Sequence, residues 1–101
     1  MKKKRLSLTD EDIQKLTSLF KILSEPSRLK ILRSLFSGEK CVSDIIENTG
    51  LLQANVSKQL RILQDSNVVS CRPSGLQRFY RIIDDKIYNL CKMICKEGKI
   101  K

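Results

Sequence analysis

The residues of this chain with the most evident chemistry are four cysteines and a group of basic and amide side chains. Cys41 and Cys71 lie mid-chain, whereas Cys91 and Cys95 lie four residues apart near its end. Because the chain contains no histidine, Ser-His-Asp and Cys-His catalysis and every His-containing zinc site are excluded. The sequence also has no Gly-rich phosphate loop, so we do not expect an enzyme.

Positive charge is the second chemical feature. The 101 residues carry 20 Lys and Arg against 11 Asp and Glu, for a net charge of +9. Four of these cations, Lys2, Lys3, Lys4 and Arg5, lie in a basic arm over residues 1–8 that we expect to be disordered when free and to add nonspecific attraction; a simple solubilising tail is the alternative. Such an excess attracts a polyanion, but it does not distinguish DNA from RNA or from an anionic membrane.

The compartment is predicted from what the sequence lacks. No run of 18 apolar residues and no apolar stretch typical of a signal peptide occurs, so we expect a cytoplasmic protein without membrane contact. Thiols stay mostly reduced in that compartment. The four cysteines therefore indicate buried small side chains, a soft-metal site or a redox sensor rather than a structural disulfide.

Apolar periodicity predicts the elements that position these residues, in a single domain over residues 9–98. Helical spacing predicts helices that begin near Thr9, Pro26, Val42 and Ala54. We expect Ser24 to cap the second helix, and Gly38 and Gly50 to end the second and third. These signals describe four helices, the last two of them joined by a Gly-containing turn.

After the fourth predicted helix, the spacing of the apolar residues changes from helical to alternating. The β-branched and aromatic residues over 68–72 and 77–83 predict a hairpin with its turn at 73–75, and a last helix follows Asp84 and ends at Gly98. On the hairpin, Tyr80 and Cys71 share the inward parity. The order α-α-α-α-β-β-α predicts a mainly α (α+β) fold, the winged helix-turn-helix.

Polar side chains on the predicted helix over 54–66 and just before it point away from its apolar stripe. They are Gln53, Asn55, Ser57, Lys58 and Arg61. Gln and Asn can bind adenine with two hydrogen bonds, Arg and Lys can bind guanine, and Ser can reach bases or phosphate. In the second helix of a helix-turn-helix this face predicts contacts in the DNA major groove; a merely solvated helix face is the alternative.

A second polar set flanks the hairpin turn. Its members are Arg72, Ser74, Gln77 and Arg78. They would bring the hairpin tip to the DNA backbone or minor groove, although they could also be incidental charge on a solvated hairpin. Arg28, at the start of the second predicted helix, could bind a phosphate or form an intramolecular salt bridge.

Three segments together resemble the ArsR/SmtB family of bacterial repressors. They are LSEPSRLKIL over 23–32, GLLQANVSKQLRIL over 50–63 and NVVSCRPSGLQRFYRI over 67–82, and the resemblance covers roughly residues 20–83. It implies a homodimer paired through its first and last helices. It also implies an operator with two half-sites in double-stranded DNA, from which an effector releases the protein.

The resemblance narrows the choice of effector, because family members often respond to metals or thiols. Arsenic and cadmium responders carry ELCVCDL where this chain has EKCVSDI over 39–45, so Ser43 replaces their second cysteine. The zinc site that the family carries on its last helix is not expected here, because the chain has no histidine to bind the metal. Sulfide responders pair a cysteine of the second helix with one of the last, but Arg33 stands at the second-helix position.

Cys91 and Cys95 remain as the sulfur pair on one face of the last helix. Their Cβ atoms would lie about 5–6 Å apart, which is too far for a disulfide unless the helix bends. With Cys41 or the pair of a second copy, they could hold As(III), Cd(II) or Cu(I). Thiol redox chemistry and simple packing in a dimer interface stay open as alternatives.

The sequence thus predicts a sequence-specific DNA-binding transcriptional regulator, a homodimeric repressor released from its operator by a thiol-directed effector. The alternative is a winged-helix module for protein or RNA contact that senses no effector. The net positive charge of the chain is compatible with both functions. The exposed amide and basic side chains of the fourth helix favour the repressor, because protein contact would not require a basic face.

Overall fold

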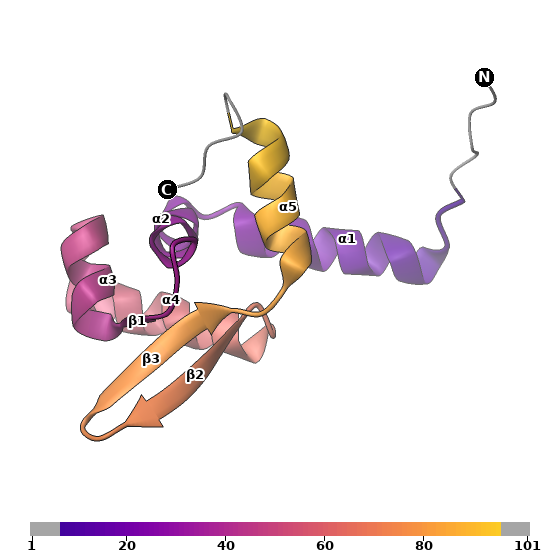
Figure 1. Ribbon diagram of the computed structural model, residues 1–101. Helices are drawn as coiled ribbons and strands as arrows, with labels where there is room; N and C mark the ends of the chain where they lie inside the picture. The colour runs from indigo at the N-terminus through magenta and orange to yellow at the C-terminus, as the bar shows by residue number, and fades with distance from the viewer. Residues whose placement is uncertain (1–6, 96–101) are drawn as a thin grey trace.

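The computed structural model describes residues 7–95. In chain order the elements are α1 (Asp10–Leu23), α2 (Pro26–Leu35), β1 (Lys40–Cys41), α3 (Val42–Thr49), α4 (Gln53–Asp65), β2 (Val69–Ser74), β3 (Gln77–Ile82) and α5 (Asp85–Ile94). Figure 1 shows the β2–β3 hairpin as a wing that projects below the helices, with α1 extending away from α2, α3 and α4. The predicted mainly α winged helix-turn-helix is confirmed. Within residues 7–95 no helix combines the length and apolarity needed to cross a membrane.

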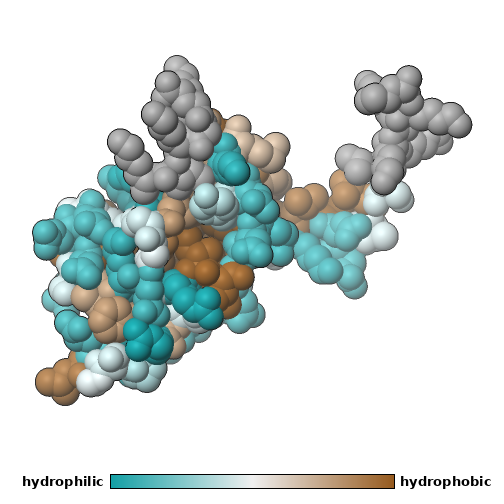
Figure 2. Space-filling model, in the orientation of Figure 1, coloured by the Kyte–Doolittle hydropathy of each residue, from teal (hydrophilic) through white to brown (hydrophobic). Residues whose placement is uncertain are grey.

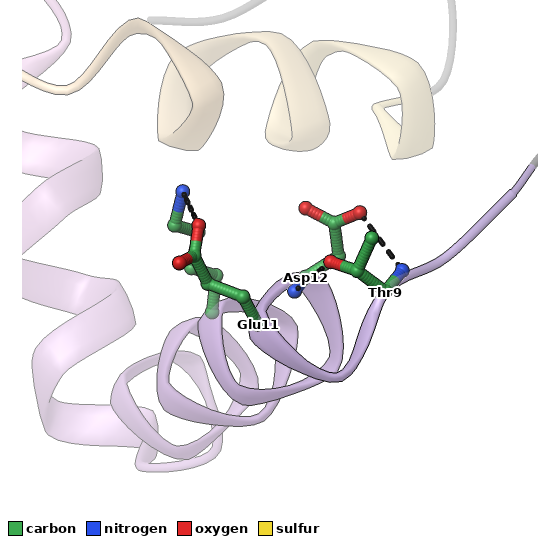
Figure 3. Close-up of polar contacts among 4 residues, drawn as sticks. Thr9, Glu11 and Asp12 are labelled. Atoms are coloured by element: carbon green, nitrogen blue, oxygen red, sulfur yellow. Dashed lines mark hydrogen bonds and ion pairs between the residues drawn. The ribbon is translucent and has the colours of Figure 1, made fainter.

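The predicted basic arm over 1–8 falls mostly outside the described residues, as does the end of the predicted domain at 98. The first helix begins at the N-cap Thr9. Its hydroxyl accepts from the Asp12 N–H at 3.0 Å, while the Asp12 carboxylate accepts from the Thr9 N–H at 3.1 Å (Figure 3). This reciprocal capping box satisfies two backbone donors and fixes where α1 starts.

Two expected helix boundaries are wrong. Glu25, not Ser24, caps α2, because its carboxylate accepts from the Ser27 N–H at 3.0 Å. The last helix ends at Ile94 rather than at Gly98, and Cys95 adopts an extended conformation. The side chain of Ile94 is 77% exposed, so in one chain little packing stabilises this last turn.

The wing belongs to an antiparallel sheet of order β1-β3-β2. Ser74 pairs with Gln77, which leaves Gly75 and Leu76 as a two-residue turn. Gly75 has a φ of 62°, which suits the first position of a type II′ turn.

The expected turn at 73–75 is therefore wrong, because Pro73 lies within β2 opposite Arg78. A proline is tolerated there because β2 is an edge strand, which does not need every N–H for pairing. The third strand, β1, was not predicted. Two residues are too short to display the alternation from which a strand is read.

One cluster of buried side chains holds α2, α3, α4, the wing and α5 together. It consists of Ile31, Leu32, Leu35, Ile45, Val56, Leu60, Leu63, Val68, Val69, Tyr80 and Ile87. The predicted inward parity of the hairpin is confirmed, because Tyr80 is buried and Cys71 packs against this cluster. Helix α1 contributes no buried residue and touches the core only through half-buried side chains.

Candidate nucleic-acid interface

The connection between α3 and α4 contains a residue whose backbone is in the left-handed conformation. Gly50 follows α3 with a φ of 71°, and its N–H donates to the Ile46 carbonyl at 2.8 Å. A residue with a Cβ is strained in this conformation, so glycine allows the chain to leave α3 and re-enter a helix within three residues. The predicted Gly-containing turn is confirmed, and it places α4 with its N-terminus exposed beside α3.

Helix α4 has a buried side and a solvated side. Its buried apolar residues are Val56, Leu60 and Leu63. Four of the predicted DNA-contacting residues are exposed and therefore available to a ligand: Gln53, Ser57, Lys58 and Arg61. Neither Lys58 nor Arg61 forms an ion pair within residues 7–95, so both charges are uncompensated by near neighbours.

Asn55 does not join this exposed set. It is half-buried, its Nδ2 donates to the Ser27 hydroxyl at 3.2 Å, and its Oδ1 accepts from Gln59 Nε2 at 3.0 Å. The amide group is thus engaged between α4 and α2. We expected Asn55 to contact a base, but in the structure both ends of its amide already have partners within the protein.

All four predicted residues of the wing are exposed, and three of them, Ser74, Gln77 and Arg78, form no ion pair among the described residues. Arg78 forms no ion pair among the described residues, and its Nη1 lies 3.9 Å from the Cys71 sulfur. Leu76, at the tip, is fully exposed. Figure 2 shows an apolar protrusion at this end of the hairpin.

The fourth wing residue, Arg72, is occupied within the fold. It donates to Glu39 twice, from Nη2 at 2.7 Å and from Nε at 3.1 Å, and its guanidinium lies 5.1 Å from the centroid of the Phe79 ring. These hydrogen bonds lower the pKa of the Glu39 carboxyl and raise the pKa of Arg72. Arg72 therefore links the wing to the segment before β1, and Glu39 neutralises the charge of Arg72.

The helix set and the wing set meet at one groove of about 410 Å³. Gln53 and Ser57 of α4 line one side, and Gln77 and Arg78 of the wing line the other. Cys41 lies among the α3-side lining. The structure thus brings together residues that the sequence assigned separately to a helix face and to a hairpin.

Gln59 was missed by the sequence prediction. It is only 5% exposed although it is polar, and its Oε1 accepts from Arg28 Nε at 2.8 Å. Arg28 also donates from Nη1 to the carbonyls of Lys21 and Ile22, at 3.1 and 3.2 Å. Arg28 therefore forms no salt bridge within the described residues, and its guanidinium is hydrogen-bonded to neutral groups instead. A signal was available, since Gln59 lies three residues after buried Val56 on the same helix face.

The predicted cysteine set is divided between two places. Cys41 is buried at the N-cap of α3, with its sulfur 3.2 Å from the Ser43 hydroxyl. Cys91 and Cys95 are half-buried at the end of α5, where the Cys95 N–H donates to the Cys91 carbonyl at 3.0 Å. Burial raises the pKa of the Cys91 thiol. Across residues 7–95 no three His, Cys, Asp or Glu residues form a metal-holding group, so Cys41 does not join the α5 pair.

Comparison with known proteins agrees with this architecture. Residues 25–70, which span α2 to the start of β2, match the family described as bacterial regulatory protein, arsR family. The arsenical resistance operon repressor of Staphylococcus aureus is 37% identical over 81 residues, which cover 76% of this chain and 78% of that protein.

Solved structures show the same likeness. The crystal structure of the AntR antimony-specific transcriptional repressor is similar with a TM-score of 0.81 and 30% identity, covering 88% of this chain and 81% of that one. The homodimeric winged helix-turn-helix DNA-binding domain Mb0332 from Mycobacterium bovis is similar with a TM-score of 0.71 and 27% identity, covering 89% and 86%.

These relatives are DNA-binding regulators rather than enzymes, in agreement with the prediction from the missing catalytic residues. The matched segment contains α3 and α4, the predicted helix-turn-helix, and lies within the residues 20–83 that the sequence resemblance covers. This chain therefore belongs to the ArsR family of bacterial regulatory proteins and is a DNA-binding transcriptional repressor of the winged helix-turn-helix fold.

Proposed function

We propose that the protein is a sequence-specific repressor that reads the DNA major groove with the exposed face of α4. Gln53, Ser57, Lys58 and Arg61 would contact base edges and phosphates, and Ser74, Gln77 and Arg78 would contact the adjacent backbone or minor groove. The observation that carries this proposal is the single groove lined by Gln53, Ser57, Gln77 and Arg78. Asn55 and Arg72 receive supporting roles, because each is already engaged inside the fold.

The active form is proposed to be a homodimer paired through α1 and α5. Helix α1 leaves Ile13, Leu16 and Phe20 exposed, and Figure 2 shows apolar surface along this helix. On α5 the exposed large hydrophobic residues are Tyr88, Met93 at 81% and Ile94 at 77%. Several exposed large apolar side chains on two helices indicate a surface that a partner covers, and the similar domain from Mycobacterium bovis is homodimeric.

Effector sensing is assigned to Cys91 and Cys95, because α5 belongs to the proposed dimer surface. Two thiolates suit soft ions such as As(III), Cd(II) or Cu(I), and a third sulfur would have to come from the second copy. The relatives named for arsenical resistance and for antimony support a soft-metal effector. Two alternatives compete with soft-metal binding. A thiol oxidant could act on the same pair of cysteines, or the two cysteines could only pack in the dimer interface without sensing an effector. We also propose a cytoplasmic location, because a repressor acts where the chromosome lies.

The test is selection from random DNA duplexes by the full chain at moderate salt. A dimer with two recognition helices should enrich an inverted repeat whose half-sites are centred about 10–10.5 base pairs apart, or a multiple of that spacing. Failure to enrich any duplex, together with binding to single-stranded or structured RNA, would instead favour the alternative winged-helix module.

The effector assignment has its own test on the selected duplex. Arsenite, Cd(II), Cu(I) and polysulfide are each added to the protein–DNA complex, and release is followed by fluorescence anisotropy. Cys91→Ser/Cys95→Ser should abolish release by the active compound, whereas the control Cys71→Ala should respond as the native protein does. A double variant that still responds would place the sensor elsewhere.

A further inference from the structure

Four side chains form a continuous hydrogen-bonded network beneath the exposed face of α4. They are Arg28, Gln59, Asn55 and Ser27, in that order. Arg28 Nε donates to Gln59 Oε1 at 2.8 Å, Gln59 Nε2 donates to Asn55 Oδ1 at 3.0 Å, and Asn55 Nδ2 donates to the Ser27 hydroxyl at 3.2 Å. The network therefore ties two points of α4, one turn apart, to the first turn of α2.

The direction of every bond follows from Arg28, because a guanidinium can only donate. Gln59 must turn its oxygen toward Arg28, so its nitrogen faces Asn55, which in turn must present its own oxygen. Gln59 is 5% exposed, and no buried side-chain nitrogen or oxygen of residues 7–95 lacks a partner. The other three residues are half-buried, and a satisfied network around a buried amide selects one geometry, since a rotation of α4 would leave the amide of Gln59 unpaired.

Arg28 extends the network to α1. Its Nη1 donates to the carbonyls of Lys21 and Ile22 in the last turn of that helix, where the Lys21 carbonyl also accepts from Ser24. Because the guanidinium is planar and rigid, Nε and Nη1 keep a fixed separation. The end of α1 and the buried side of α4 are thus held at a fixed distance from each other.

We propose that Arg28 and Gln59 are positioning residues for DNA recognition. They set the rotation of α4 and its distance from α1, the helix through which two copies pair, so that the two recognition helices keep the spacing of two half-sites. The inference rests on the proposed function, in which α4 reads DNA and α1 pairs the protomers. Gln59 lies beneath the exposed face, so it acts through the placement of Ser57 and Arg61 rather than by touching DNA.

The experiment is a double-mutant cycle on the full chain. The variants are Arg28→Met, Gln59→Leu and both together, and the matched control is Gln64→Leu, an exposed glutamine of the same helix. The dissociation constant is measured for the selected duplex and for a scrambled duplex, and dimer mass is verified for each variant.

Each single variant should lower the preference for the selected duplex about tenfold, because each removes the charged, part-buried hydrogen bond between Arg28 and Gln59 on which the position of α4 depends. Binding to the scrambled duplex should change less than about twofold, and Gln64→Leu should match the native protein. The double variant should also lose about tenfold rather than a hundredfold, since both substitutions break the same bond. Losses that multiply, or equal losses on both duplexes, would overturn the inference.

Half-site spacing gives a readout that a merely structural role would not move. On duplexes whose half-sites are shifted by one or two base pairs, the native protein should lose affinity steeply and the Gln59→Leu variant much less. Equal spacing preference in both proteins would overturn the inference. If Gln59→Leu does not fold, Ser27→Ala removes only the last acceptor of the network and should relax the spacing preference in the same direction. A native protein that selects no duplex would overturn the proposed function as well, whereas selection with unchanged variants would overturn this inference alone.

Discussion

Replacing Arg78 with Ala removes one cation from the wing of each protomer and should change the salt dependence of DNA binding by a calculable amount. Arg78 is exposed and forms no ion pair within the described residues, so its charge is available to a phosphate. Each neutralised phosphate contributes about 0.9 to the slope of log affinity against log salt concentration. Two copies in a dimer give a slope smaller by about 1.8 in the variant.

That slope difference has a measurable consequence. When salt rises about fourfold, from about 50 to about 200 mM, the affinity advantage of the native protein over Arg78→Ala should shrink about 12-fold. The selected and scrambled duplexes should show the same change, because a phosphate contact carries no sequence information. Fluorescence anisotropy titrations at four or five salt concentrations, with one anion throughout, measure it.

Two control variants separate a phosphate contact from a general loss of charge. Arg33→Ala removes an exposed arginine of α2 that lines a different groove, and it should leave the slope unchanged. Arg72→Ala should change the slope less than Arg78→Ala does, because Glu39 already neutralises Arg72. An unchanged slope in Arg78→Ala, or an equal change in Arg33→Ala, would refute the placement of Arg78 against the DNA backbone.

Three further predictions concern other parts of the molecule. Phe20→Asp places a charge on the exposed apolar face of α1 and should convert dimer to monomer in sedimentation experiments, with operator affinity lost in parallel; a variant that stays dimeric would move the interface elsewhere. Hydrogen bonds from Thr9, first of all from its backbone N–H, lower the pKa of Asp12, so the carboxylate stabilises the fold above its ordinary titration near pH 4 and this contribution is lost as the pH falls; Asp12→Asn removes the titrating group and should lower the melting temperature at pH 7 and reduce its acid dependence between about pH 4 and pH 2, and identical pH profiles would contradict the assignment. Because burial raises the pKa of Cys91, iodoacetamide should modify this thiol slowly at pH 7, with the rate still rising above about pH 8.5, as measured by mass spectrometry of the modified peptide; rapid modification at neutral pH would indicate a thiolate instead.

The sequence predicted the helices and the wing because their apolar periodicity is long enough to read. The stripe of α4 and the inward parity of Tyr80 and Cys71 are confirmed for this reason. Short-range signals were less reliable. Strand β1 has only two residues, and the end of α5 at Ile94 reflects missing packing within one chain rather than the Gly98 signal.

The polar interior of the site could be predicted only in part. Because Asn55 is polar and lies two residues after Gln53, we predicted that it would be exposed like its neighbours. Its position one turn before Gln59 places it at the edge of the buried side, where an i, i+4 pair can form. Arg28 depends on contacts with residues 21, 22 and 59, and such a tertiary arrangement has no local sequence signal.

The measurement that tests the central claim most directly compares the native protein with the Ser57→Ala/Arg61→Ala variant on its selected duplex and on a scrambled one. If the exposed face of α4 reads base edges, the native protein should prefer the selected duplex by at least about a thousandfold. The double variant should lose most of that preference while it remains a folded dimer, because each base contact contributes about 1–3 kcal/mol of discrimination. A double variant that keeps the full preference would contradict the claim that α4 is the helix that reads the operator.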